Sequence, residues 1–264
     1  MTPPPPPACA KPERLRFGEG RPAAAGRVLV ALDTAVAAQA VAQARAVGAA
    51  AAGVKLGLEF FAANGPEGVR RVAAEGRKLF LDLKFHDIPT TVAGAVRAVA
   101  PLAPFMLTVH AGGGGEMLRA AVAAAAETAA RTGTARPLVV AVTVLTSLAD
   151  ADLAALGHAG TAADQVRRLA DLAQRCGLDG AVCSPHEIAA LRAQCGAAFA
   201  LVTPGIRPVW AAADDQRRVM TPGEAARLGA DYLVIGRPIT GAADPAAAAR
   251  RIAAEIAAAG TGLG

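Results

Sequence analysis

With 264 residues, the chain has the length of one large α/β domain or two small ones, and 53% of its residues are hydrophobic. No apolar run approaches the ~20 residues that a membrane-spanning helix needs, which argues against a membrane protein. The formal net charge of +5 comes from scattered arginines, and a single Trp and a single Tyr leave little for base stacking, which argues against a nucleic-acid partner.

Residues 1–26 are rich in Pro, Gly and Arg and show no apolar period, so we expect a disordered extension before one domain over 27–264. From Arg27 onward, short apolar segments alternate with helical ones. The predicted strands are 27–33, 52–57, a third from Lys78 that ends before Pro89, 105–110, 138–145, 180–184, 199–203 and 232–235. The clearest predicted helices are 35–47, 66–75, 92–99, 116–130, 164–176, 185–194, 222–228 and 245–258.

This alternation predicts the fold class. Nearly continuous apolar strands joined by helical crossovers indicate a parallel sheet that is buried on both faces. Eight such repeats in about 235 residues fit a closed (β/α)₈ TIM barrel in a single domain. An open, doubly wound sheet is the alternative. The first predicted strand ends in Ala31-Leu-Asp33-Thr without the glycines of a dinucleotide-binding turn, which weakens that reading.

Polar residues gather at the C-terminal ends of the predicted strands, where barrels place their active sites. The polar residues are Asp33, Lys55, Asp82, Lys84, Asp87, His110, Thr146, Ser147, Ser184, Arg207 and Arg237, and Pro204 and Gly236 belong to the segments of the two arginines. Their coincidence at one end is stronger evidence for an active site than any single motif.

Lysine is scarce in this chain, since only Lys11, Lys55, Lys78 and Lys84 stand among the 27 basic residues. Carboxylates on both sides of Lys84 favour its charged form, so it is predicted to act as a fixed ammonium rather than as an amine nucleophile. The ammonium of Lys55 would repel Mg²⁺ from this cluster, which predicts a metal-free site. A purely structural charge network is the alternative, disfavoured because unused buried charges are costly.

The last two predicted strands lead to a predicted phosphate site. Gly236 leaves backbone N–H groups accessible, Arg237 offers a bidentate fork, and Gln216 in the long loop before 222 can add a donor. A structural ion pair is the alternative for Arg237. His110 is predicted to form a hydrogen-bonded wall, whereas His86 shows no partner pattern and is read as structural or surface.

The segment Asp82-Leu-Lys84-Phe-His86-Asp87-Ile-Pro-Thr-Thr91 closely resembles the signature of the orotidine 5′-phosphate decarboxylase family. The resemblance runs in order from about Val28 to the last helix and leaves out the first 26 residues. Further matching segments are Ala31-Leu-Asp33, Val54-Lys55-Leu-Gly, Val109-His110-Ala, Leu145-Thr146-Ser147, Thr203-Pro-Gly-Ile-Arg207-Pro, Asp215-Gln216-Arg-Arg218-Val and Val234-Ile-Gly236-Arg237.

This resemblance implies an enzyme of de novo pyrimidine synthesis that converts orotidine 5′-monophosphate to uridine 5′-monophosphate and CO₂ without cofactor or metal. It implies that Lys84 donates the proton to C6 and that Asp82 faces the departing carboxylate. Asp33 and Lys55 would hold the ribose hydroxyls. Ser147, with Thr146 beside it, would contact the pyrimidine.

The resemblance also implies that Gln216, Gly236 and Arg237 hold the phosphate, with Arg207 and the Pro204 segment nearby. The positions of Asp87 and Thr91 reach into a neighbouring subunit in this family, which implies a homodimer with two shared sites. Cysteine usage and the absence of a signal-peptide core favour a cytoplasmic location.

Two rival readings stay open. A Mg²⁺-dependent sugar-phosphate lyase or decarboxylase of the same superfamily shares the D-x-K-x-x-D element, but Lys55 and the segments around Pro204–Arg207 and Gln216 argue against it. A non-catalytic nucleotide-binding protein on the same fold is the other rival, and the intact set of four charges argues against that one.

Overall fold

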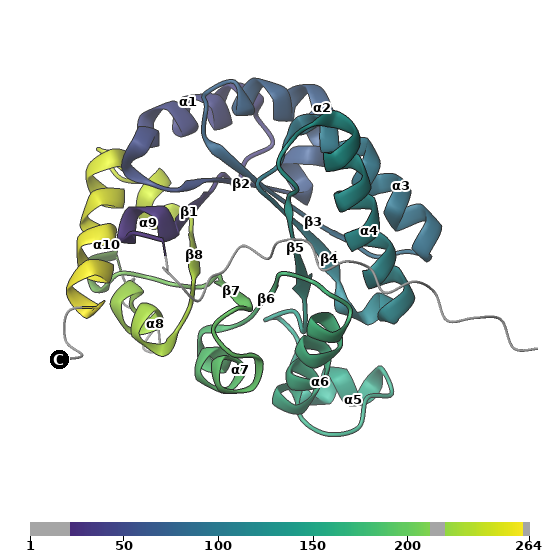
Figure 1. The fold of residues 1–264 in the computed structure, drawn as a ribbon. Helices are drawn as coiled ribbons and strands as arrows, with labels where there is room; N and C mark the ends of the chain where they lie inside the picture. The colour runs from purple at the N-terminus through teal and green to yellow at the C-terminus, as the bar shows by residue number, and fades with distance from the viewer. Residues whose placement is uncertain (1–21, 212–219, 261–264) are drawn as a thin grey trace, which may run out of the picture.

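The computed structural model describes residues 22–211 and 220–260, and their parallel strands close into a barrel surrounded by helices (Figure 1). Each strand pairs with its neighbours in sequence, and β1 also pairs with β8, which confirms the predicted (β/α)₈ barrel over the open sheet. The strands are β1 (Val28–Ala31), β2 (Gly53–Gly57), β3 (Lys78–Phe85), β4 (Met106–His110), β5 (Leu138–Val142), β6 (Gly180–Val182), β7 (Ala200–Thr203) and β8 (Tyr232–Ile235).

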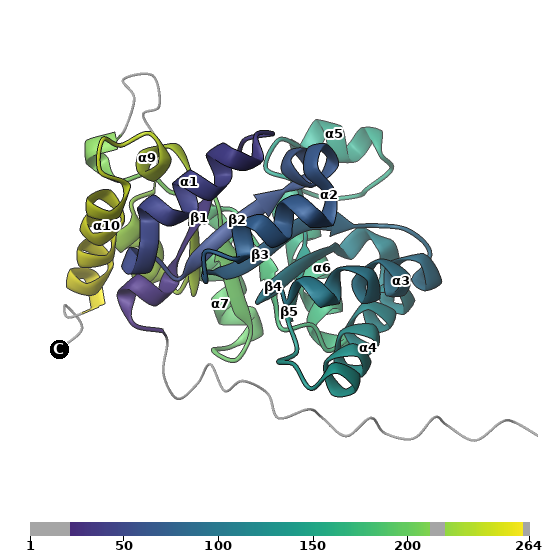
Figure 2. The ribbon, with the colours of Figure 1, turned by 90° about the horizontal axis from the view of Figure 1, so that it is seen from above.

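The helices between the strands form the outer layer, and α5 and α9 lie at the same end of the barrel (Figure 2). The α-helices are α1 (Ala37–Val47), α2 (Leu58–Ala73), α3 (Pro89–Val99), α4 (Gly114–Thr132), α5 (Asp150–Ala155), α6 (Ala162–Arg175), α7 (Ile188–Cys195), α8 (Pro222–Leu228), α9 (Arg237–Thr240) and α10 (Pro245–Gly260). Short 3₁₀ helices are η1 (Ala24–Arg27), η2 (Gly48–Ala50), η3 (Ala100–Leu102), η4 (Ala111–Gly113), η5 (Pro185–Glu187) and η6 (Val209–Ala211).

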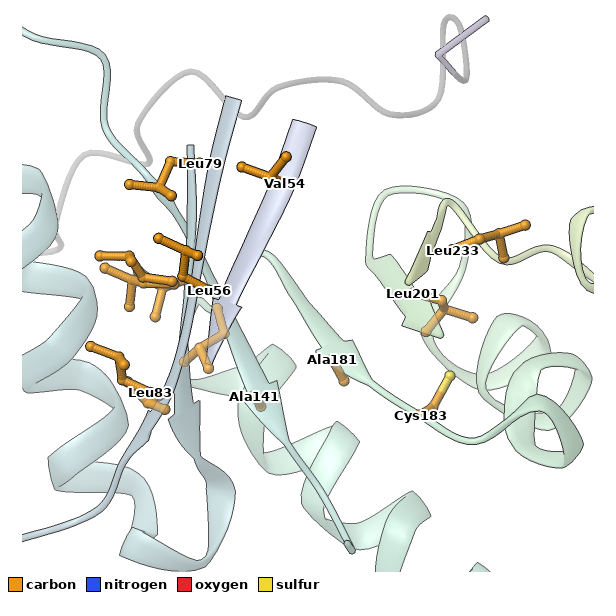
Figure 3. Packing of buried hydrophobic residues seen from close by; sticks show 14 of the residues in the cluster. Val54, Leu56, Leu79, Leu83, Ala141, Ala181, Cys183, Leu201 and Leu233 are labelled. Atoms are coloured by element: carbon orange, nitrogen blue, oxygen red, sulfur yellow. The ribbon is translucent and has the colours of Figure 1, made fainter. Parts of the chain in front are cut away.

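The core has two layers because side chains alternate faces along a strand. Leu29 and Ala31 of β1 belong to an inner apolar cluster, whereas Val28 and Val30 belong to the larger cluster between the barrel and the helices. Figure 3 shows part of this outer cluster, including side chains of β2 and β3. On β2, Val54 and Leu56 face outward, so the side chain of Lys55 between them enters the barrel.

Several element boundaries differ from the prediction. Helix α2 begins at Leu58 and kinks at Gly65, which has φ 57°, whereas the sequence predicted a start at Pro66 because proline favours the first turn of a helix. By the same rule α3 begins at Pro89 rather than Val92. The predicted fifth strand ends early, at Val142, and the residues after it turn over the barrel mouth.

The predicted extension also needs a correction at its C-terminal end. Ala24 packs against the core within η1, and Arg27, predicted to open the first strand, instead ends η1 and donates through Nε to the carbonyl oxygen of Asp231 at 3.4 Å. Small residues in the Ala24–Gly26 stretch let the chain lie close against α10. The prediction of disorder for residues 1–21 lies outside the described residues.

Two carboxylates, the buried Asp231 and the 15% exposed Asp179, lie at the opposite end of the barrel, where the strands begin. Asp231 accepts the backbone N–H of Leu201 at 2.8 Å and forms an ion pair with Arg192. Asp179 accepts the backbone N–H of Val139 at 2.8 Å, and Nη1 of Arg136 donates to it at 3.0 Å. Each carboxylate therefore ties a strand start to a neighbouring arginine.

Within the described part of the chain, no helix combines the length and the apolar character that a bilayer crossing demands.

Candidate active site

A cavity of about 390 Å³ opens at the C-terminal ends of the strands. Ten of the residues singled out in the sequence line it, together with apolar residues from β5, β6 and β8. These ten are Asp33, Lys55, Asp82, Lys84, Thr146, Ser184, Pro204, Arg207, Gly236 and Arg237. The barrel thus brings together residues that are up to about two hundred positions apart, as parallel strands place their C-terminal ends at one edge.

Four charges of alternating sign form a chain along one wall of this cavity. Nζ of Lys55 lies 3.5 Å from Oδ1 of Asp33 and 3.6 Å from Oδ2 of Asp82, and Nζ of Lys84 lies 3.0 Å from Oδ1 of Asp82. The side chains of Lys55 and Asp82 are only 12% and 14% exposed. Each ammonium therefore has a carboxylate partner, which offsets the cost of placing charges inside the barrel mouth.

The backbone of β3 is distorted where it carries two of these charges. Leu81 pairs with Leu107 and Phe85 with Val109, so four steps along β3 span only two steps along β4. Lys84, within this irregular stretch, has φ 49°, a left-handed conformation that costs a lysine about 1–2 kcal/mol. Bulges at strand ends commonly re-aim a side chain, and here the distortion directs Lys84 toward Asp82.

Thr108 lies beside this distortion and is not among the residues predicted to form the site. Its hydroxyl accepts the backbone N–H of Lys84 at 2.8 Å and donates to Oδ1 of Asp82 at 3.1 Å. The residue is fully buried. The available signal was a hydroxyl in the middle of an otherwise apolar strand.

The spacing predicts Asp87 beside Lys84, and the family resemblance places it in the site of a neighbouring subunit. Its side chain is exposed, and its carboxylate accepts the backbone N–H of Ile88 at 2.6 Å. Ile88 itself is 63% exposed, and Thr91 is also exposed. The turn after β3 carries these side chains away from the cavity.

Two arginines also line the cavity. Arg207 follows β7, and Arg237 begins α9 directly after Gly236 and β8. Both also line a neighbouring cavity of about 300 Å³. The backbone N–H of Arg207 donates to the carbonyl of Met220 at 3.2 Å, which joins the two described ends of the β7–α8 connection. The cavity therefore offers two guanidinium groups to an anion.

Among the other predicted site residues, Thr146 lines the cavity, while Ser147 beside it is exposed and does not. Gln216 lies outside the described residues.

His86 and His110 stack with ring centroids 5.0 Å apart and planes 8° from parallel. Nδ1 of His110 accepts the backbone N–H of Gly112 at 3.1 Å, in agreement with the predicted hydrogen-bonded wall. Burial lowers the pKa of His110, and His86 and Lys84 lower it further. His86 is exposed, in agreement with its reading as a surface residue, and its contact with His110 arises because β3 and β4 are adjacent.

No group of three or more His, Cys, Asp or Glu side chains in residues 22–211 and 220–260 is arranged to hold a metal ion.

Comparison with known proteins supports one family. Residues 26–252 match the model of the orotidine 5′-phosphate decarboxylase / HUMPS family. The chain is 59% identical over 230 residues to the orotidine 5′-phosphate decarboxylase of Rhodospirillum rubrum, covering 87% of this chain and 93% of that protein. The corresponding protein of Paramagnetospirillum magneticum is 56% identical over 229 residues, with 87% and 97% covered.

The fold has a close counterpart among solved structures. The crystal structure of orotidine 5′-phosphate decarboxylase from Lactobacillus acidophilus superposes with a TM-score of 0.78 at 37% identity, covering 87% of this chain and 98% of that one. With the family match over residues 26–252, this likeness leads to one conclusion: the chain belongs to the orotidine 5′-phosphate decarboxylase / HUMPS family.

Proposed function

We propose that this protein decarboxylates orotidine 5′-monophosphate to uridine 5′-monophosphate and CO₂, as a step of pyrimidine biosynthesis. The observation that carries the proposal is the chain of four alternating charges in a cavity that two arginines also line. Named relatives that are more than half identical support the same activity.

In the proposed mechanism, Lys84 acts at the reacting carbon. Loss of CO₂ leaves an electron pair on C6 of the pyrimidine, and the Lys84 ammonium stabilises this charge and then delivers a proton to it. That stabilisation applies to charge that develops only on the way to the transition state, which is the kind of interaction that accelerates a reaction. Asp82, 3.0 Å from Lys84, fixes the direction of the ammonium and faces the departing carboxylate.

The remaining residues hold the substrate in this proposal. Asp33 and Lys55 bind the ribose hydroxyls. Arg207 and Arg237 bind the phosphate, together with Gly236. Thr146 contacts the base from the cavity wall, with Ser147 beside it, and Pro204 and Gln216 belong to the phosphate site. Binding energy from the remote phosphate then serves to position the pyrimidine over Lys84. The proposal includes no cofactor and no metal.

We further propose a homodimer in which each active site uses residues of both subunits. Asp87 and Thr91 are exposed and stand outside the cavity of their own subunit, with the 63% exposed Ile88 between them. An exposed carboxylate beside an exposed apolar side chain suits a contact with a second copy. The proposal places the enzyme in the cytoplasm, supported by the free, buried thiols of Cys176, Cys183 and Cys195.

The test is the loss of orotidine 5′-monophosphate absorbance with purified, metal-stripped protein in excess EDTA. Undiminished turnover under these conditions is the expected result. Activity that disappears in EDTA and returns with Mg²⁺ would instead favour the metal-dependent lyase. Tight binding of uridine 5′-monophosphate without any turnover would identify a non-catalytic nucleotide-binding protein.

A further inference from the structure

The position of Lys84 depends on a backbone conformation that β3 would not adopt unaided. Regular pairing between β3 and β4 stops after Leu81 and resumes at Phe85, and Lys84 between them has φ 49°. A lysine rarely takes up this left-handed conformation, so neighbouring groups must hold it. A group on the neighbouring strand β4 does so.

Thr108 on β4 supplies that group. Its neighbours Leu107 and Val109 pack in the outer cluster, and Met106 lies in the inner cluster, so the side chain of Thr108 points into the barrel. There its hydroxyl makes two different contacts. It accepts the backbone N–H of Lys84 at 2.8 Å, and it donates its own hydrogen to Oδ1 of Asp82 at 3.1 Å.

These two hydrogen bonds have a fixed sense. A backbone N–H can only donate and an ionised carboxylate can only accept, so the hydroxyl must serve as acceptor toward Lys84 and donor toward Asp82. The same Oδ1 atom of Asp82 also lies 3.0 Å from Nζ of Lys84. The Thr108 hydroxyl, the Asp82 carboxylate and Lys84, through its backbone N–H and its ammonium, therefore form a closed ring of contacts.

We propose that Thr108 is a positioning residue for decarboxylation, which locks the left-handed backbone at Lys84 and orients the carboxylate of Asp82. The inference rests on the proposed function and extends it to a residue that does not line the cavity. Thr108 acts through the two charged residues and does not touch the substrate. Its loss lets the ammonium move away from the reacting carbon, and displacements of about 1 Å are costly for catalysis.

The decisive variant is Thr108→Val, which keeps the shape of the side chain and removes both hydrogen bonds. We expect kcat to fall about 10- to 100-fold, with KM for orotidine 5′-monophosphate and the affinity for uridine 5′-monophosphate within about threefold of the wild type. Thr108→Ser retains the hydroxyl and should recover most of kcat. Thr128→Val, the same change at a buried threonine of α4, is the matched control and should leave kcat unchanged.

Wild-type kcat in Thr108→Val, or a loss in Thr108→Ser as large as in Thr108→Val, would overturn the proposal. A parallel rise in KM would also contradict it, because the phosphate grip is remote from Thr108. Should Thr108→Val fail to fold, Thr108→Ala removes the same two hydrogen bonds and carries the same expectations.

A second measurement does not depend on activity. Amide hydrogen exchange at Lys84, followed by NMR on ¹⁵N-labelled protein, should accelerate about tenfold or more in Thr108→Val and little in Thr108→Ser. Unchanged exchange at Lys84 would refute the backbone lock. A wild-type protein that exchanges as expected but does not turn over orotidine 5′-monophosphate would refute the proposed function alone.

Discussion

Oδ1 of Asp82 and Nζ of Lys84 lie 3.0 Å apart at a point where β3 has left regular pairing with β4. Regular alternation already places both side chains on the inner face of the barrel. The distortion then turns the lysine toward the aspartate, and Oδ2 of the same carboxylate remains 3.6 Å from Lys55. One carboxylate therefore serves two ammonium groups and sets the geometry of the site.

Lys84→Ala tests the proposed proton donor. We expect turnover of orotidine 5′-monophosphate to fall roughly 10³-fold or more, because the charge that stabilises the C6 carbanion is lost. Binding of uridine 5′-monophosphate, measured by calorimetry, should persist through the phosphate site. Lys78→Ala, at the exposed start of the same strand, is the control and should keep wild-type turnover. Substantial residual turnover in Lys84→Ala would remove Lys84 from the mechanism.

Arg237→Ala tests the phosphate grip. Loss of a charge-assisted contact should raise KM for orotidine 5′-monophosphate about 10- to 100-fold. The slow reaction of orotidine, which has no phosphate, should be unaffected, because the substituted side chain has nothing to hold there. Arg237→Lys should restore only part of the loss, since an ammonium lacks the bidentate fork. Equal effects on both substrates would show that Arg237 acts on the fold instead.

Mixing Lys84→Ala and Asp87→Ala chains tests the shared site. Each variant alone should be inactive in the proposed homodimer. A random mixture should regain about a quarter of the wild-type activity, because a heterodimer collects both substitutions in one site and leaves the other intact. Heterodimers isolated with two affinity tags provide the control for mixing. If these heterodimers stay inactive, Asp87 does not serve across subunits.

His110 is expected to make the free energy of unfolding decrease as the pH falls. Its pKa in the folded state lies below the ordinary value of 6.5, chiefly through burial. The unfolded chain therefore binds the proton first as the pH falls below about 6.5, and the free energy of unfolding decreases toward acid. His110→Asn should show a smaller fall in the urea midpoint between pH 8 and pH 5 than the wild type. Exposed His158→Asn is the control, and identical falls in all three proteins would contradict this assignment.

Asp231→Ala tests the buried carboxylate at the strand starts. The side chain of Asp231 is 1% exposed and that of its partner Arg192 is 15% exposed, so the substitution leaves a largely buried guanidinium without its ion pair. We expect a loss of about 3–5 kcal/mol in the free energy of unfolding, read from urea titrations. Asp171→Ala breaks an exposed ion pair with Arg175 and should cost at most about 1 kcal/mol. A similar loss of unfolding free energy in the two variants would contradict the expectation that the buried ion pair contributes more than the exposed one.

The pattern of apolar strands and helices was enough to predict the barrel, and strand ends were enough to predict most of the cavity lining. Lys55 and Asp82 illustrate why, since alternation along an apolar strand decides which way each side chain points. The start of α2 at Leu58 was missed because Pro66 was taken as the first residue of the helix, although it follows a kink at Gly65 inside α2. The start of α3 was missed because Pro89 was read as the end of the strand, although it is the first residue of the helix.

The rest of the site depends on contacts between strands that no local pattern encodes. Thr108 matters because two extra residues in β3 bring the Lys84 N–H to its hydroxyl, and a broken register leaves no signature in either strand alone. The stacking of His86 on His110 has the same origin. Asp87 was predicted beside Lys84 from its spacing, but the turn before Pro89 sends it outward.

Closure of the barrel through β1 and β8 has a consequence for self-association. Every strand of the described chain has a partner on both sides, so the sheet presents no open edge onto which a strand of another molecule could add. Contacts between copies of this protein must therefore form through the side chains of loops and helices, not through backbone hydrogen bonds between strands. The closure that brings the charges together at one end of the barrel also protects the apolar strands from edge-to-edge aggregation.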